Sequence, residues 1–142
     1  MFMKALFVAF AFAVALSAMP AHASTIVAKI DLSEQRMQVF VDGWPRYSWA
    51  VSTARSGYRT PVGTYKAYRL EKMWYSRKYD MSPMPNSIFF KGGYAIHGTN
   101  YLKRLGTPAS HGCVRLHPDN AAQLYSLVRT NGMANTQILV VQ

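Results

Sequence analysis

The stretch from Ser110 to His117 reads SHGCVRLH and contains the only cysteine of the 142-residue chain. Histidines flank this cysteine at positions 111 and 117, and a third, His97, lies sixteen residues before it. A thiol among imidazoles has three common explanations: a catalytic nucleophile, a metal site, or an ordinary buried cysteine. A lone cysteine excludes an internal disulfide.

Cys113 suits the nucleophile role, because a neighbouring imidazole can take its proton and remain as a cation beside the sulfur. On an extended chain His111 and Arg115 would share one face with Cys113, so His111 would run parallel to the thiol instead of facing it. We therefore expect His97 to be the base, supplied by an adjacent element. Acidic residues are scarce nearby, so the backbone carbonyl of Gly98 is the expected group that orients the His97 ring.

Gly112 precedes the cysteine and removes side-chain bulk where a substrate backbone must approach. It also permits a tight turn that could direct backbone N–H groups toward a developing oxyanion. Thiol, imidazole and turn together are the parts that acyl transfer to cysteine requires.

Zinc is the alternative chemistry. His97, His111, Cys113 and His117 would offer three imidazoles and a thiolate, which is a sufficient ligand set. However, His-x-Cys is not a common zinc spacing, and neither Cys-x-x-Cys nor His-Glu-x-x-His accompanies it. We expect no metal or cofactor, and we expect His117 at the start of a helix.

The elements that must position these residues are predicted to be mainly β. The period-two alternation of strands occurs in several short segments, and Asp42-Gly43 and Gly92-Gly93 mark bends between them. The expected strands cover residues 26–30, 37–41, 47–53, 63–68, 87–91, 94–98 and 136–142, and the second-last of these carries His97.

One clear helix is predicted near the C-terminus, in HPDNAAQLYSLVRTNG. Pro118 and Asp119 suit its first turn, and Asn131-Gly132 would end it.

Residues 71–87 lack a clean period and contain Pro83 and Pro85, so they predict a long ordered loop or flap. Long loops in compact domains are often functional. Trp74 and Tyr75 in this segment are candidate substrate contacts.

The N-terminus predicts a secretory signal over residues 1–23 and a single mature domain over residues 24–142. Lys4 precedes an apolar run that is too short to span a bilayer, and Ala21-His22-Ala23 has the small-x-small pattern of a cleavage site. An uncleaved membrane anchor is the alternative. Removing 23 of 142 residues leaves 119, which is a usual size for one domain.

The formal net charge is +10, which raises the possibility of nucleic-acid binding. Export argues against that partner, because the polyanions of the cell envelope are wall peptides, lipopolysaccharide and anionic lipids. The cationic residues are also scattered along the chain, so a solvated basic face and attraction of an acidic substrate both remain open.

Four segments, in order, resemble the L,D-transpeptidase catalytic domain, the YkuD-like family. They are AKIDLSEQRMQVFVDG, RTPVGTY, the IHG that contains His97, and LGTPASHGCVRL. The resemblance extends over essentially the whole mature chain. It implies a sandwich-like, mainly β fold.

The resemblance also implies residue roles. Cys113 matches the nucleophile, His97 the general base, and Gly98 the carbonyl that orients the base. His111 matches a histidine near the oxyanion, and N–H groups around residues 111–113 would form the oxyanion hole. Two further matches are expected to face substrate, Ser110 at a small hydroxyl position and Arg115 at a position usually Arg or Asn.

The implied reaction takes place in the periplasm on tetrapeptide stems of peptidoglycan. The cysteine would attack the third residue, release D-alanine and form a thioester, which an amine acceptor resolves. The acceptor could be another stem or an envelope protein, and water would make the enzyme a carboxypeptidase instead. A non-catalytic wall-binding module is the remaining alternative.

Overall fold

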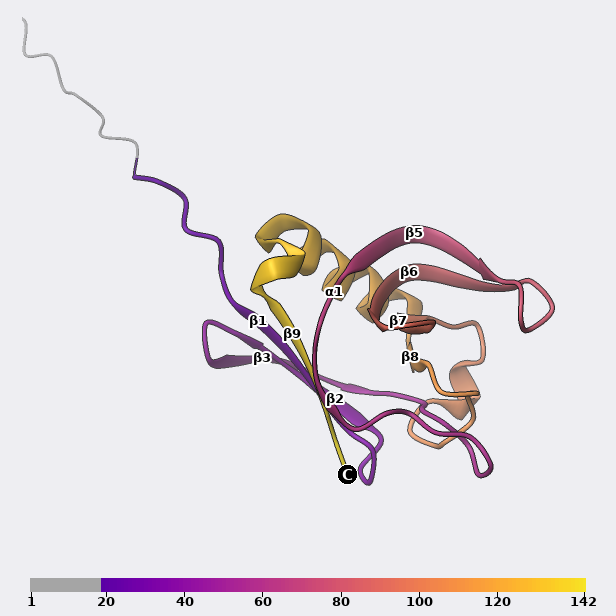
Figure 1. Cartoon of the computed structure of the whole chain (residues 1–142). Coiled ribbons are helices and arrows are strands. Elements are labelled where there is room, and N and C mark those ends of the chain that lie inside the picture. The colour runs from indigo at the N-terminus through magenta and orange to yellow at the C-terminus, as the bar shows by residue number, and fades with distance from the viewer. Residues whose placement is uncertain (1–18) are drawn as a thin grey trace, which may run out of the picture.

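The computed structural model describes residues 19–142 (Figure 1). Residues 1–18, which hold most of the predicted signal segment, lie outside the described residues. Across residues 19–142, no helix is long and apolar enough to cross a membrane.

Five strands form the first sheet, in the order β3-β2-β1-β9-β4. Their bounds are β1 Ile26–Asp31, β2 Arg36–Val41, β3 Trp44–Ala50, β4 Gly63–Lys66 and β9 Thr136–Val141. The predicted meander is confirmed, because β1, β2 and β3 pair antiparallel in succession. Asp42 and Gly43 join β2 to β3 with φ of 50° and 81°, the left-handed geometry that favours this residue pair in tight hairpins.

The second sheet has the order β5-β6-β7-β8. Its strands are β5 Arg69–Ser76, β6 Ser82–Lys91, β7 Tyr94–Gly98 and β8 Val114–Leu116. The first three pair antiparallel, whereas β7 and β8 run parallel. The mainly β, sandwich-like fold expected from the sequence is therefore confirmed, with its strands in two sheets.

The helix α1 spans Pro118–Asn131, as the sequence predicts, and short 3₁₀ turns cover Leu102–Arg104 and Met133–Asn135. His117 caps the helix, because its Nδ1 accepts a hydrogen bond from the Asp119 N–H at 3.1 Å. Gly132 follows the last turn with φ of 93°, and its N–H donates to the Val128 carbonyl.

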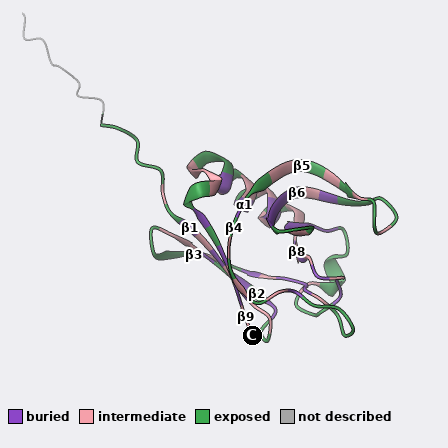
Figure 2. Ribbon diagram, viewed as in Figure 1, coloured by how far each residue is buried: buried purple, intermediate pink, exposed green. Residues whose placement is uncertain are grey.

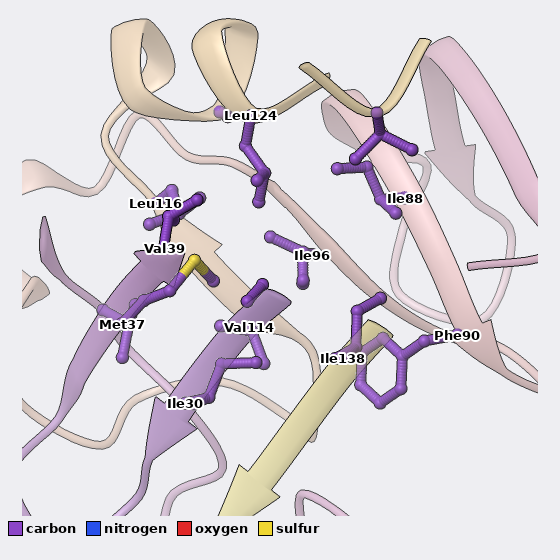
Figure 3. Packing of buried hydrophobic residues seen from close by; sticks show 14 of the residues in the cluster. Ile30, Met37, Val39, Ile88, Phe90, Ile96, Val114, Leu116, Leu124 and Ile138 are labelled. Atoms are coloured by element: carbon purple, nitrogen blue, oxygen red, sulfur yellow. The ribbon is translucent and has the colours of Figure 1, made fainter. Parts of the chain in front are cut away.

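One hydrophobic core joins the two sheets and the helix (Figure 3). Leu124 of α1 projects toward Ile96 of β7, and Ile30 and Ile138 reach the same region from the first sheet. All four side chains are fully buried. At about 1.5–3 kcal/mol for each fully buried aliphatic side chain, this core is the main source of stability.

The parallel register of β7 and β8 separates the core from the chemistry. Ile96 pairs with Val114, and both are buried in the core. His97 pairs with Arg115 one residue further on, so both project to the opposite face. Cys113 lies two residues before Arg115 and reaches that same outer face.

The predicted loop over residues 71–87 was wrong, because β5 and β6 form a hairpin there. The two prolines misled the prediction, since proline rarely occupies a strand interior. Here β7 pairs with β6 between Ile88 and Lys91, so Pro83 and Pro85 occupy a stretch of β6 beyond that pairing and do not interrupt it. The hairpin extends past β7, and its tip is exposed (Figure 2).

Candidate active site

A cavity of about 640 Å³ lies on the outer face of the second sheet. The β5–β6 hairpin, the bend at Gly92–Gly93, the loop at residues 99–101 and the turn at residues 110–113 border it. His97, His111, Cys113 and Arg115 all line it, so the structure brings these sequence-predicted residues together.

His97 is held at the end of β7 in one ring orientation and one tautomer. Its Nδ1 lies 2.7 Å from the Gly98 carbonyl oxygen, which only accepts hydrogen bonds. Nδ1 therefore carries the hydrogen, and Nε2 has a free lone pair. The side chain is 6% exposed, and this burial lowers the pKa of His97 to about 4. The Gly98 carbonyl opposes that shift, and the Arg115 charge adds to it.

Cys113 lies beside β7, where it packs against Met84, Phe89 and Ala95. Its Sγ is 3.9 Å from the Gly93 carbonyl oxygen. Burial raises the pKa of the Cys113 thiol, while the Ala95 N–H and the Arg115 charge act in the opposite direction. In the resting site the thiol and the imidazole are both driven toward their neutral forms.

The turn that carries Cys113 is closed by a serine hydroxyl. Ser110 is buried, and its Oγ donates to the Cys113 carbonyl at 2.6 Å and accepts from the Gly112 N–H at 3.0 Å. Ser110 borders the cavity, as expected for a substrate contact, but its hydroxyl is engaged within its own turn. The Gly112 N–H is likewise occupied and does not point freely at an oxyanion.

Gly112 is required by the packing of the protein itself. Its φ is +138°, and an added Cβ would lie 2.5 Å from Tyr94 Cε1 and 2.9 Å from the Arg59 carbonyl oxygen. The space we expected a substrate to use is therefore filled by Tyr94 and Arg59. Thr60 fixes the other side of the turn, since its buried hydroxyl donates to the Gly112 carbonyl at 2.8 Å and accepts from the Ala54 N–H at 3.1 Å.

His111 is clamped between two tyrosines. The Tyr79 ring stacks on it at 4.0 Å between centroids, and the Tyr58 ring meets it edge-on at 4.7 Å. Partial burial lowers the pKa of His111, and the Arg55, Arg115 and Lys78 charges lower it further. Residues 111–113 form a bend, so the extended chain on which the sequence analysis placed His111 parallel to Cys113 does not occur there.

Arg115 is half-buried in the cavity wall, with its guanidinium carbon 5.8 Å from the centre of the Tyr101 ring. Burial lowers the pKa of Arg115, and the Cys113 and Tyr101 side chains oppose this shift. Over residues 19–142, no carboxylate lies within 4 Å of its guanidinium.

Trp74 and Tyr75 are separated by the alternation of β5. Trp74 borders the cavity, meets Phe89 edge-on at 5.6 Å and lies under Arg69 at 4.6 Å. Tyr75 is 48% exposed and does not border the cavity, so the expected substrate contact there is not supported. Had residues 69–76 been predicted as a strand, the alternation of side chains would have placed Trp74 and Tyr75 on opposite faces.

His117 does not join the other histidines, because it caps α1 as the sequence analysis expected. In the described part of the chain, no three His, Cys, Asp or Glu side chains gather closely enough to bind a metal ion. Sequence reasoning missed Thr60, Tyr58 and Tyr79, which contact the turn at residues 110–113. RTPVGTY contained the only signal for Thr60, and the two tyrosines meet His111 only in the folded chain.

Replacing Gly112 with alanine is expected to destabilise the protein by about 2 kcal/mol more than the same change at Gly57. Both glycines have positive φ, but a Cβ at Gly57 would meet nothing within 4 Å. The difference between Gly112→Ala and Gly57→Ala in urea unfolding therefore reports the clash with Tyr94 and Arg59. Equal losses of stability would contradict this account of the turn.

Protonation of His97 should couple folding to pH. Because its folded pKa is about 4 and its unfolded pKa about 6.5, the unfolded state binds the proton first as the pH falls. This contribution, about 3 kcal/mol, is fully present above pH 6.5 and is lost as the pH falls through 4. Urea unfolding between pH 4 and 7 should show a steeper decline for the natural protein than for His97→Gln. A parallel decline in both proteins would refute this assignment.

Comparison with protein-family models assigns the sequence to one family. The model of the YkuD L,D-transpeptidase catalytic domain matches residues 25–140. A comparison with curated protein sequences gave no significant match.

Solved L,D-transpeptidases share the fold. The enzyme from Stackebrandtia nassauensis is 27% identical, with a TM-score of 0.72 over 83% of this chain and 56% of that one. The protein from Xylanimonas cellulosilytica is also 27% identical, with a TM-score of 0.71 over 86% of this chain and 63% of that one. The enzyme from Mycobacterium smegmatis shares the fold at 22% identity and a TM-score of 0.75, over 84% and 59% of the two chains.

This chain therefore spans roughly three-fifths of the length of the structures it resembles. The family-model match covers most of its sequence, and the two-sheet fold agrees with it. The chain belongs to the L,D-transpeptidase catalytic domain family.

Proposed function

We propose that this protein is a cysteine-dependent L,D-transpeptidase that acts on the tetrapeptide stems of peptidoglycan. The observation that carries the proposal is the arrangement of His97 and Cys113. The Gly98 carbonyl fixes the His97 tautomer with Nε2 free, and the register of β7 and β8 directs both side chains into one cavity.

In the first half of the reaction Cys113 is the nucleophile and His97 is the base. The thiol proton moves to Nε2 of His97 while Sγ attacks the carbonyl carbon of the third stem residue, typically diaminopimelate. The C–N bond to the terminal D-alanine then breaks, and the departing amine takes the proton from His97. A thioester on Cys113 remains.

In the second half an acceptor amine attacks the thioester and transfers its proton to His97. Sγ leaves as a thiolate and regains that proton. A diaminopimelate side chain as acceptor gives a cross-link between stems, an amine of an envelope protein gives attachment to the wall, and water gives hydrolysis. None of these steps requires a metal or an organic cofactor.

The oxyanion requires donors other than the Gly112 N–H, which is bonded to Ser110. We assign this role to the N–H groups of His111 and Cys113, which flank Gly112 in the same rigid turn. The packing of the Tyr58 and Tyr79 rings against His111 then has a catalytic purpose, because it holds the residue whose N–H is one of these donors.

The pKa shifts suit a proton transfer that accompanies attack. A raised thiol pKa and a lowered imidazole pKa both disfavour a resting ion pair. The imidazole is therefore neutral and able to accept the proton throughout the neutral range. The transfer becomes favourable when the carbonyl carbon forms its bond to sulfur, since the negative charge then moves to the oxyanion.

A carbapenem such as imipenem tests the nucleophile directly, since a transpeptidase related by fold has been solved in complex with imipenem. Intact mass should show one adduct on the natural protein and none on Cys113→Ala. His97→Ala should slow acylation about 10²–10⁴-fold, as expected for loss of a general base. His111→Ala should slow it less.

The controls test whether the variant folds, whether the protein only binds the wall, and whether activity depends on a metal. Cys113→Ala should keep the circular dichroism of the natural protein, so that loss of the adduct reports chemistry. An unlabelled natural protein that binds isolated sacculi would favour the wall-binding module, and loss of activity with a chelator at intact thiol would favour zinc.

We further propose that the chain is exported to the periplasm and cleaved after Ala23. Over residues 19–142, hydrogen bonds to the domain begin at Ser24, whose N–H donates to Asn131 Oδ1 at 2.9 Å. The next N–H, of Thr25, donates to Asp42 Oδ1 at 2.9 Å. The ordered domain thus starts at the residue that the cleavage pattern leaves first.

N-terminal sequencing of the exported protein should begin at Ser24. Ala23→Tyr should block processing and leave the precursor in the membrane fraction, because a large side chain does not fit the small-x-small pattern. A mature chain that retains residues 1–23 would contradict the proposal.

A further inference from the structure

The positive charge of the cavity is unevenly neutralised. Four cationic side chains border it, and no Asp or Glu among the described residues does. Arg69 at one end is 2.7 Å from the Glu71 carboxylate. Arg115 and Lys78, toward the His111 end, have no carboxylate within 4 Å in residues 19–142. The unneutralised charge of the cavity is therefore carried by Arg77, Lys78 and Arg115, and the charges of the last two act on His111.

The two tyrosine rings that contact His111, Tyr58 and Tyr79, each also lie near a cationic side chain. Lys78 lies 5.5 Å from the centre of the Tyr79 ring, and Arg55 lies 4.9 Å from that of Tyr58. Since these two rings contact His111 from different sides, they hold cations from two separate loops near one imidazole. Arg115 reaches the same imidazole from β8, and the charges of all three affect its titration.

This arrangement is unfavourable without an anion. Like charges held together repel one another, and the half-buried Arg115 has lost part of its hydration without gaining a carboxylate. Charge-assisted hydrogen bonds to a bound carboxylate would relieve both costs. The Arg69 end of the cavity is a weaker site for a carboxylate, because the Arg69 guanidinium is already paired with Glu71.

We propose that Lys78 and Arg115, supported by Arg55, bind the terminal carboxylate of the donor's leaving residue. This inference rests on the proposed function, in which D-alanine leaves from the donor. Its carboxylate lies one residue beyond the scissile carbonyl, about 3.5 Å along the chain. Arg115 and Lys78 border the same cavity as Cys113, and the Arg115 charge acts on the Cys113 thiol, so a carboxylate one residue beyond the attacked carbonyl lies in the part of the cavity that holds these cations.

The site therefore selects donor stems by the group at their C-terminus. A stem with one residue and a free carboxylate beyond the scissile bond places its charge among the three cations. An amidated end, or a stem longer by one residue, removes that charge from the site and leaves the cations unpaired. Lys78 thus becomes a specificity residue that the sequence pattern does not identify, while Arg55, which does not border the cavity, contributes only through its charge.

Binding to Cys113→Ala protein tests this without turnover. The probes are two tetrapeptide stems that differ only in a C-terminal D-alanine carboxylate or carboxamide, and the readout is Kd by isothermal titration calorimetry. We expect the acid to bind about tenfold more tightly than the amide, because only the acid makes charge-assisted hydrogen bonds to the cations, and solvent screens them in part. Adding Lys78→Ala should reduce that ratio to about twofold.

Lys103→Ala is the matched control. Lys103 is an exposed lysine that does not border the cavity, and its loss changes the net charge equally. It should preserve the tenfold ratio, so that a general charge effect is separated from a local site. Equal Kd values for acid and amide, or a ratio that Lys78→Ala leaves intact, would overturn the inference.

The two proposals fail in different ways. If imipenem does not acylate the natural protein, the proposed reaction is wrong, whereas the acid-to-amide ratio still decides the carboxylate site. If imipenem acylates Cys113 and both stems bind equally, only the carboxylate site is wrong.

Discussion

The parallel pairing of β7 with β8 is the constraint on which the rest of the structure depends. Because side chains alternate along a strand, pairing Ile96 with Val114 places both in the core, and His97 and Arg115 then face outward together. A slip of one residue would bury the guanidinium and turn the aliphatic side chains to solvent. The energy of the core therefore fixes where His97 and the chain that follows Cys113 lie relative to each other.

The scarcity of acidic residues determines how this site can work. A carboxylate beside His97 would favour an imidazolium, but the orienting group is the neutral Gly98 carbonyl. Burial then dominates both titrations and leaves the pair uncharged at rest. The same scarcity leaves the other cations of the cavity without a carboxylate partner among residues 19–142, since only Arg69 is paired, with Glu71.

The sequence predicted the parts of the molecule that depend on local chemistry. Alternation identified most strands, and the residues that begin and end α1 were recognisable because capping uses adjacent residues. The hairpin at residues 69–91 was missed because its prolines disfavour strands, and only the tertiary pairing shows that they lie where β7 no longer pairs. Gly112 was correctly marked as necessary, but its reason is the Tyr94 ring, which the chain order does not place beside it.

The neutral resting thiol also affects how readily the protein is oxidised. Peroxide and disulfides react with the thiolate, so a cysteine whose pKa is raised by burial is a poor target for both. In the proposed reaction the thiol reacts only while a substrate carbonyl is in place to receive it. Burial beside Met84, Phe89 and Ala95 thus protects the proposed nucleophile between turnovers.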